Sequence, residues 1–74
     1  MKIYPNPADN IVTIETLLKD NYNVLITDVP GRTIYRANLT DNRQIDVNGW
    51  QAGMYYVQVS SADGYRNVQK LIVR

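Results

Sequence analysis

The sequence predicts an all-β fold, a small immunoglobulin-like β-sandwich of about seven antiparallel strands. Apolar and polar residues alternate along most of the chain, which is the periodicity of half-buried strands. Turn residues interrupt this alternation at intervals of about 8 to 12 positions, as in sandwiches and barrels. Helical periodicity is nearly absent, because the only candidate segment, Glu15 to Asp20, is too short to be stable alone.

Each expected strand is bounded by proline, by glycine or by a cluster of Asp and Asn residues. The expected ranges are 2–4, 11–15, 22–28, 32–37, 44–47, 54–60 and 65–73. So many short strands in so short a chain imply two sheets packed face to face, rather than one open sheet.

The alternation also predicts which side chains face the core. These are Val12, Ile14, Val24, Ile26, Ile34, Ile45, Val47, Tyr55, Val57 and Val59. The last strand leaves the choice open, because its apolar residues fall on both faces and a β-bulge would reconcile them. They are Leu71 and Val73 on one face and Val68 and Ile72 on the other.

Three glycines mark places where the backbone needs unusual freedom. Pro30 and Gly31 occupy the second and third positions of a tetrapeptide that favours a type II turn. Asp63-Gly64 separates two strand runs, which is a strong hairpin signal. Gly53 lies where the chain crosses into a new strand, so we expect it to use its freedom in φ.

The composition excludes several classes of function. The 74 residues suffice for one domain of modest stability, and the absence of cysteine means that packing alone must stabilise it. The net charge of +1 comes with no basic cluster and no acidic tail, so we expect no nucleic-acid partner. No apolar run approaches the roughly 20 residues of a membrane helix, so we expect no membrane insertion.

The sequence also lacks the residues that catalysis needs. A nucleophile requires an activating base, and the chain contains neither His nor Cys. Most aspartates fall at turns and strand ends, where Asp is favoured for its local hydrogen bonds, and Asp/Asn pairs such as Asp9-Asn10 lack the spacing of a calcium loop. We therefore expect no catalytic residue, no metal ligand and no cofactor.

Two further interpretations stay open. Trp50 and six tyrosines would suit a non-catalytic carbohydrate-binding module, since aromatic rings stack on sugar faces. Tyr35, Tyr56 and Tyr65 occupy positions that favour exposure. The chain would also serve as a structural spacer in an extracellular enzyme.

The two ends of the chain carry its most specific residues. Two prolines fix the backbone twice within three positions near the start, and the chain closes on an apolar strand that ends with a charge. We predict that both ends contact a partner, which would either pair with a free edge strand or dock on the surface near the last strand. The predicted contact residues are Tyr4, Pro5, Asn6, Pro7, Lys70, Leu71, Ile72, Val73 and Arg74. The residues to which we assign a structural role are Asp28, Gly31, Gly53 and Tyr55.

Taken in order and spacing, these motifs resemble the type A C-terminal sorting domain of the type IX secretion system of Bacteroidetes. The matching segments are 4–8 with Val12 and Ile14, 24–28 with Gly31 and Arg32, 45–47, 53–59 and 70–73. The chain departs from the family at Pro30, where a polar residue is usual, and at Trp50, where Leu is usual. Both departures are compatible with the fold.

The resemblance implies that residues 1–74 are a single domain excised from the C-terminus of a larger secreted cargo protein. Such a domain directs its cargo from the periplasm through the outer-membrane translocation machinery to the cell surface or the medium. A sortase-like protease then typically removes it by cleavage upstream of Tyr4. For the isolated domain we expect a monomer or a weak edge-paired dimer.

Overall fold

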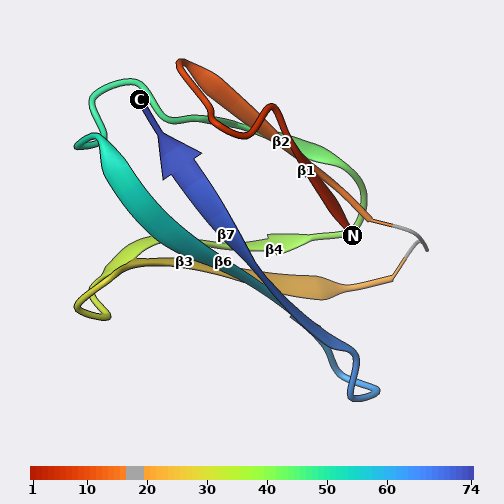
Figure 1. The fold of residues 1–74 in the computed structure, drawn as a ribbon. Coiled ribbons are helices and arrows are strands. Elements are labelled where there is room, and N and C mark those ends of the chain that lie inside the picture. Colours follow the sequence, from red (N-terminus) through yellow and green to blue (C-terminus); the bar gives the residue numbers. More distant parts are fainter. Residues whose placement is uncertain (17–19) are drawn as a thin grey trace.

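The computed structural model describes residues 1–16 and 20–74, and it contains seven strands in two antiparallel sheets (Figure 1). The strands are β1 (Lys2–Tyr4), β2 (Ile11–Glu15), β3 (Tyr22–Asp28), β4 (Thr33–Leu39), β5 (Arg43–Asp46), β6 (Gly53–Ser61) and β7 (Arg66–Val73). One sheet has the order β1-β2-β5 and the other the order β4-β3-β6-β7. The prediction of a two-sheet β-sandwich is therefore confirmed.

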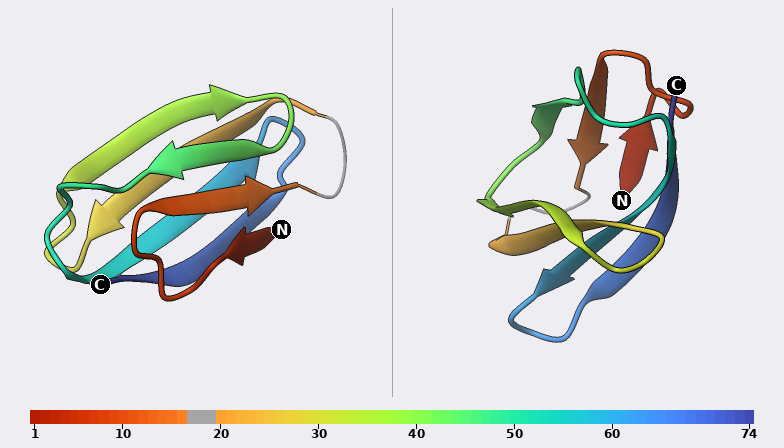
Figure 2. Two further views of the ribbon diagram at one scale, coloured as in Figure 1. Left: turned by 90° about the horizontal axis from the view of Figure 1, so that it is seen from above. Right: turned by 90° about the vertical axis from the view of Figure 1, so that its left-hand side faces the viewer.

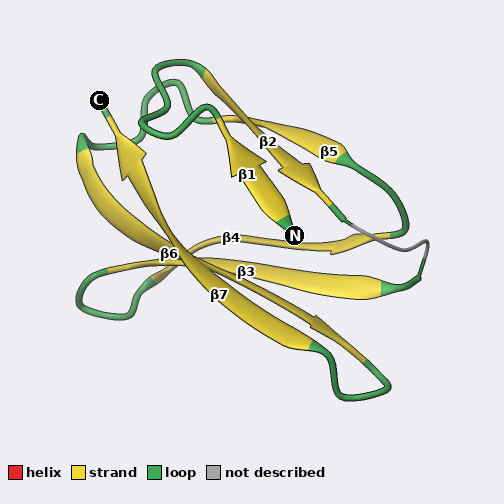
Figure 3. Ribbon diagram, turned by 45° about the vertical axis from the view of Figure 1, so that its right-hand side comes forward, coloured by secondary structure: helices red, strands yellow, loops and turns green. Residues whose placement is uncertain are grey.

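The described part of the chain consists of strands and loops (Figure 3). Within it, no helix is long and apolar enough to cross a membrane. The helix candidate from Glu15 to Asp20 falls partly outside the described residues. Its first residue ends β2, and residues 17–19 are not described.

The core lies between the two sheets and is built from every second residue of the central strands. Its fully buried side chains are Ile14, Ile26, Leu39, Leu71, Val12, Val24, Val47, Val57 and Val59. Most of them are β-branched, which suits a pleated surface covered on one side. Burying one such side chain contributes about 1.5–3 kcal/mol, so this layer supplies much of the stability of a domain without disulfides. The inward positions predicted from the alternation are confirmed, with one exception.

The prediction that Ile34 faces the core is wrong. The pairing of β3 with β4 shifts register, because Ile26 lies opposite Tyr35 whereas Thr27 lies opposite Thr33. Ile34 is therefore the extra residue of a bulge, and its side chain is 39% exposed. The inward positions of β4 are instead Tyr35 and the two alternate residues that follow it. The strand also begins one residue later and ends two residues later than expected.

The ambiguity of the last strand is resolved without a bulge. β7 pairs with β6 in one continuous register, from Gly53 opposite Val73 to Ser60 opposite Arg66. Leu71 and Val73 are buried in the core, and Val68 and Ile72 point to solvent on the outer face of the sheet. The bulge that would place all the apolar residues inside is absent from β7.

Two hairpins are closed in the same way. In the β3–β4 hairpin, the Gly31 N–H donates to the Asp28 carbonyl at 3.0 Å, and the Asp28 N–H donates to the Arg32 carbonyl at 3.1 Å. In the β6–β7 hairpin, the Gly64 N–H and the Ser61 N–H make the equivalent bonds. The glycine ends each three-residue loop with φ near +100°. The Asp63-Gly64 hairpin is confirmed, and the Pro30-Gly31 turn lies one residue earlier than predicted.

Gly53 begins β6 with a φ of +150°, a conformation that residues with a Cβ rarely adopt. A Cβ added there meets nothing within 4 Å, so a substitution acts on the backbone alone. We expect Gly53→Val to destabilise the fold by about 1–3 kcal/mol, measured by urea unfolding. The neighbouring Ala52→Val is the control, because Ala52 is exposed and lacks a positive φ. Equal unfolding midpoints for the two variants would contradict this assignment.

Candidate recognition site at the joined chain ends

The two end motifs, far apart in the sequence, lie side by side in the fold (Figure 2). The Asn6 side chain makes both hydrogen bonds that a neighbouring strand would make to the outer edge of β7. Its Nδ2 donates to the Lys70 carbonyl at 2.9 Å, and its Oδ1 accepts from the Ile72 N–H at 2.9 Å. Asn6 thus replaces a backbone peptide group along this edge.

The next residues continue the pairing with their own backbone. The Ala8 N–H donates to the Ile72 carbonyl at 2.7 Å, and the Ala8 carbonyl accepts from the Arg74 N–H at 2.9 Å. Ala8 is fully buried and forms an isolated parallel bridge with Val73. We call the pairing of Asn6, Ala8 and Asp9 with residues 70–74 the terminal clasp.

An ion pair completes the clasp at its outer end. Nε and Nη2 of Arg74 lie 3.1 and 3.2 Å from the two carboxylate oxygens of Asp9. Both side chains are well exposed, so the pair contributes about 0–1 kcal/mol and fixes direction more than stability. Ala8 and Asp9 were not predicted as partners of the last strand. The opposite charges of Asp9, next to the first end motif, and of Arg74, at the end of the second, were the available signal.

Prolines explain why a side chain, rather than backbone, opens the clasp. Pro5 and Pro7 have no N–H and cannot donate to a neighbouring strand. Asn6 lies between them, and the peptide bonds before both prolines are cis.

Tyr4 is the last residue of β1. Its hydroxyl donates a hydrogen bond to the Glu15 carboxylate at 2.9 Å, and this hydrogen bond raises the pKa of the tyrosine hydroxyl.

The clasp changes two expectations about the last strand. The expected free edge is occupied over residues 70–74, because Asn6 and Ala8 already bind its outward-facing backbone groups. The side chains of Leu71 and Val73 are buried in the core and are not presented to a partner. The predicted contact residues that remain on the surface are Tyr4, Pro5, Asn6, Pro7, Lys70, Ile72 and Arg74. We call the exposed side chains of Pro5, Pro7, Lys70, Ile72 and Arg74 the rim.

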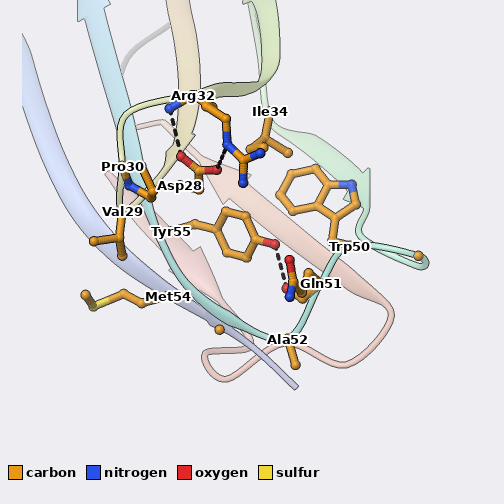
Figure 4. A pocket seen from close by; sticks show the side chains of 12 residues that line it. Asp28, Val29, Pro30, Arg32, Ile34, Trp50, Gln51, Ala52, Met54 and Tyr55 are labelled. Carbon is orange, nitrogen blue, oxygen red and sulfur yellow. Dashed lines mark hydrogen bonds and ion pairs between the residues drawn. The ribbon is translucent and has the colours of Figure 1, made fainter.

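Three of the four residues assigned a structural role, Asp28, Gly53 and Tyr55, line a shallow groove of about 410 Å³ at the start of β6, whereas Gly31 does not (Figure 4). The Asp28 carboxylate accepts from the backbone N–H and from Nε of Arg32, both at 2.7 Å, and so holds the β3–β4 turn. The Tyr55 hydroxyl donates to the Gln51 carbonyl at 2.5 Å, which fixes the approach to Gly53. These contacts organise the loops that enter β4 and β6.

Two aromatic residues, Trp50 and Tyr55, line this groove. Trp50 lies between Tyr35 and Tyr55, with ring centroids 6.5 and 5.3 Å apart and interplanar angles of 43° and 52°. Tyr35 and Trp50 pack against the core, and Tyr55 belongs to it. The rings are tilted and partly buried, so they do not form the flat platform that sugar stacking needs.

Among the residues that the structure describes, Asp28 is the one buried residue that carries a charge. Removal from water opposes its ionisation, but the hydrogen bonds and charge of Arg32 outweigh this effect and lower the pKa of the Asp28 carboxyl below its ordinary value. Among the described residues there is no group of three or more His, Cys, Asp or Glu side chains arranged to hold a metal ion.

The fold and the joined chain ends define the class of the molecule. It is a small immunoglobulin-like β-sandwich in which the N-terminal segment covers the outer edge of the last strand. Residues 2–74 match the family described as the secretion system C-terminal sorting domain. The chain therefore belongs to this family of type IX secretion domains, as its motifs predict. The sorting-domain family is non-catalytic.

Individual relatives agree with this assignment. The chain is 33% identical over 76 residues to an endo-acting ulvan lyase of Formosa agariphila, and it spans only 15% of the length of that enzyme. Its structure is similar to part of PorZ, an essential bacterial surface component of the type IX secretion system of Porphyromonas gingivalis. The TM-score is 0.85 at 25% identity, over 99% of this chain and 11% of PorZ.

A second solved structure supports the fold alone. It is a DUF3244 family protein of Bacteroides vulgatus with an immunoglobulin-like β-sandwich fold. The TM-score is 0.81 at 13% identity, over 95% of this chain and 79% of that protein.

The clasp generates a prediction about Asn6. Asn6→Ala removes two hydrogen bonds to β7 and is expected to destabilise the fold by about 1–2 kcal/mol in urea unfolding. Asn10→Ala is the matched control, since the Asn10 side chain is exposed and no hydrogen bond joins it to the described residues. If both variants unfold at the same urea concentration, Asn6 does not stabilise the edge of β7.

The lowered pKa of Asp28 predicts a dependence of stability on pH. A carboxyl whose pKa is lower in the folded state stabilises fully above its unfolded pKa, and this contribution is lost as pH falls through the folded value. Asp28→Asn should therefore have a lower melting temperature than the wild type at neutral pH. The difference between the two melting temperatures should become smaller as pH falls below about 4. Thermal melts at a series of pH values test this, and a constant difference would contradict it.

Proposed function

We propose that this chain is a non-catalytic export signal, which directs a cargo joined to its N-terminal side across the outer membrane through the type IX secretion system. The observation that carries the proposal is the family match over residues 2–74. The route passes through the periplasm and ends at the cell surface or in the medium. Residues 1–74 act as one folded domain, which a sortase-like protease removes after translocation.

The clasp bears on how the translocation machinery would read this domain. The outward-facing backbone groups of residues 70–74 already have partners, so strand addition there would first have to displace Asn6 and Ala8. Recognition of the intact domain therefore uses side chains. The rim supplies them on one side of the sandwich, next to the point where the cargo would join.

The rim combines apolar and charged contacts. Ile72 is 37% exposed and lies opposite the half-buried Met54 on β6, so the two side chains form a small apolar patch. Pro5 and Pro7 add rigid apolar surface, and Lys70 adds a positive charge. Leu71 and Val73 contribute indirectly, because they anchor β7 in the core and so position Ile72.

We also propose that the isolated domain is a monomer or a weak edge-paired dimer. Among the described strands, β4 pairs only with β3. The outer edge of β4 is therefore the edge of the four-stranded sheet at which a second copy would pair, and the bulge at Ile34 weakens it for this purpose.

A secretion assay tests the function. A fluorescent reporter with a signal peptide is joined ahead of residues 1–74, with native upstream sequence that includes the cleavage region, and is expressed in a Bacteroidetes host. We expect the reporter on the cell surface or in the medium, and we expect its export to stop when the secretion system is disabled. Retention of a folded fusion in the periplasm would contradict the proposal and favour a binding module or a spacer.

A pair of point variants tests the rim within the same assay. Deleting residues 71–74 would remove two core side chains and confuse recognition with folding. Ile72→Ser and Val68→Ser instead change exposed apolar residues on the same face of β7, inside and outside the rim. We expect about a tenfold loss of secretion for Ile72→Ser, as for one lost apolar contact of about 1.4 kcal/mol, and little change for Val68→Ser. Equal secretion by the two folded variants would remove Ile72 from the recognised surface.

A further inference from the structure

The outer face of the four-stranded sheet, which points away from the core, carries two rows of side chains that the export function does not use. In the first row, Asn23 lies opposite both Asn38 and Ser60, and Ser60 lies opposite Arg66. Every residue of this row carries an amide, a hydroxyl or a guanidinium group, and the row crosses all four strands.

The second row lies two residues further along each strand. Leu25 is opposite both Arg36 and Gln58, and Gln58 is opposite Val68. With the Gln58 amide turned so that its oxygen faces Arg66, the guanidinium donates to it from Nη2 at 3.0 Å and from Nε at 3.2 Å. This contact would hold Arg66 against the sheet and leave its remaining donors directed outward.

The rows line a shallow hollow of about 340 Å³ on this face. Its lining includes Asn23, Leu25, Arg36, Asn38, Gln58 and Ser60. Since neighbouring strands lie about 4.8 Å apart, the backbone positions of Arg36 and Arg66 are separated by about 14 Å across the sheet. This separation would allow the two guanidinium groups to pair with two successive anionic groups of one polymer.

The charge on this face has one sign. Arg36, Arg66 and Lys70 point outward from the sheet, and no ion pair joins any of them to a described residue. The described outward positions of these four strands include no Asp or Glu. The strands of the opposite sheet carry equal numbers of basic and acidic residues, namely Lys2, Arg43, Glu15 and Asp46. The excess positive charge of the strands therefore lies on the outer face of the four-stranded sheet, although the net charge of the domain is only +1.

We propose that this outer face binds an anionic polysaccharide. Arg36 and Arg66 would pair with sulfate or carboxylate groups spaced along the chain, because guanidinium groups suit these planar or multidentate acceptors. The amides of Asn23 and Asn38 and the hydroxyl of Ser60 would bond to sugar hydroxyls, and Leu25 would lie beneath a ring. The two rows lack the aromatic rings on which single-stranded nucleic acid stacks, and Tyr56, which lies in the neighbouring row opposite Lys70, is half-buried. This binding uses the two rows rather than the rim, although Lys70 of the rim lies on the same face, and it does not rest on export.

The test is a titration of residues 1–74 with dextran sulfate, uncharged dextran and single-stranded DNA, followed by NMR shifts of the backbone amides. We expect dextran sulfate alone to shift the amides of the two rows, with an affinity that falls as salt rises. Binding of uncharged dextran, equal or tighter binding of DNA, or no binding at all would overturn the proposal.

Matched variants separate this site from general charge attraction. Arg36→Gln and Arg66→Gln should each weaken binding of dextran sulfate about tenfold, as expected for the loss of one charge-assisted contact. Arg43→Gln removes the same charge from β5 in the other sheet and should change affinity by no more than about twofold. An equal loss in all three folded variants would show nonspecific attraction and overturn the proposal.

Discussion

The structure depends on how the outer edge of β7 is satisfied. An edge strand exposes backbone donors and acceptors that must bind something, and this strand also brings Leu71 and Val73 into the core. Asn6 and Ala8 bind those groups from the start of the chain. The same contacts hold the N-terminal segment in place and keep β7 in the position that the core requires.

The clasp also joins the two sheets. β1 belongs to the three-stranded sheet and β7 to the four-stranded sheet, and the segment that follows β1 crosses from one to the other (Figures 1 and 2). The loop between β4 and β5 links the same two sheets on the opposite side. A domain without disulfides thus closes one side of its sandwich with hydrogen bonds and a buried alanine, instead of a covalent cross-link.

Alternation along the chain was sufficient to predict the fold, since one-sided burial imposes a period of two on Val12 and Ile14 and on Val57 and Val59. It failed at Ile34 because a bulge arises from the pairing of two strands and is not visible in the residue pattern of one strand alone. It left β7 undecided because the choice of face depends on the other sheet, which lies far away in sequence.

The candidate site was predicted in part. Both end motifs stood out, because two prolines around Asn6 and a charge-terminated apolar strand are unusual in so short a chain. Their contact with each other was not predicted, since it depends on residues more than sixty positions apart. As a result, backbone groups assigned to an external partner are bound within the chain, and Leu71 and Val73 belong to the core. The surface that remains for recognition is smaller and consists of side chains.

The separation of the clasp residues along the chain has a consequence for the order of folding. Asn6 binds positions 64 and 66 residues further on, so its contacts close nearly the largest loop that this chain can form. Contacts of this range are costly in chain entropy and form late. During synthesis, the first residues of the domain must wait for the last strand before they acquire their native neighbours. A translation product that ends before β7 contains the sequence of β1 to β6 but cannot form the terminal clasp. Formation of the clasp therefore requires that synthesis has passed β7.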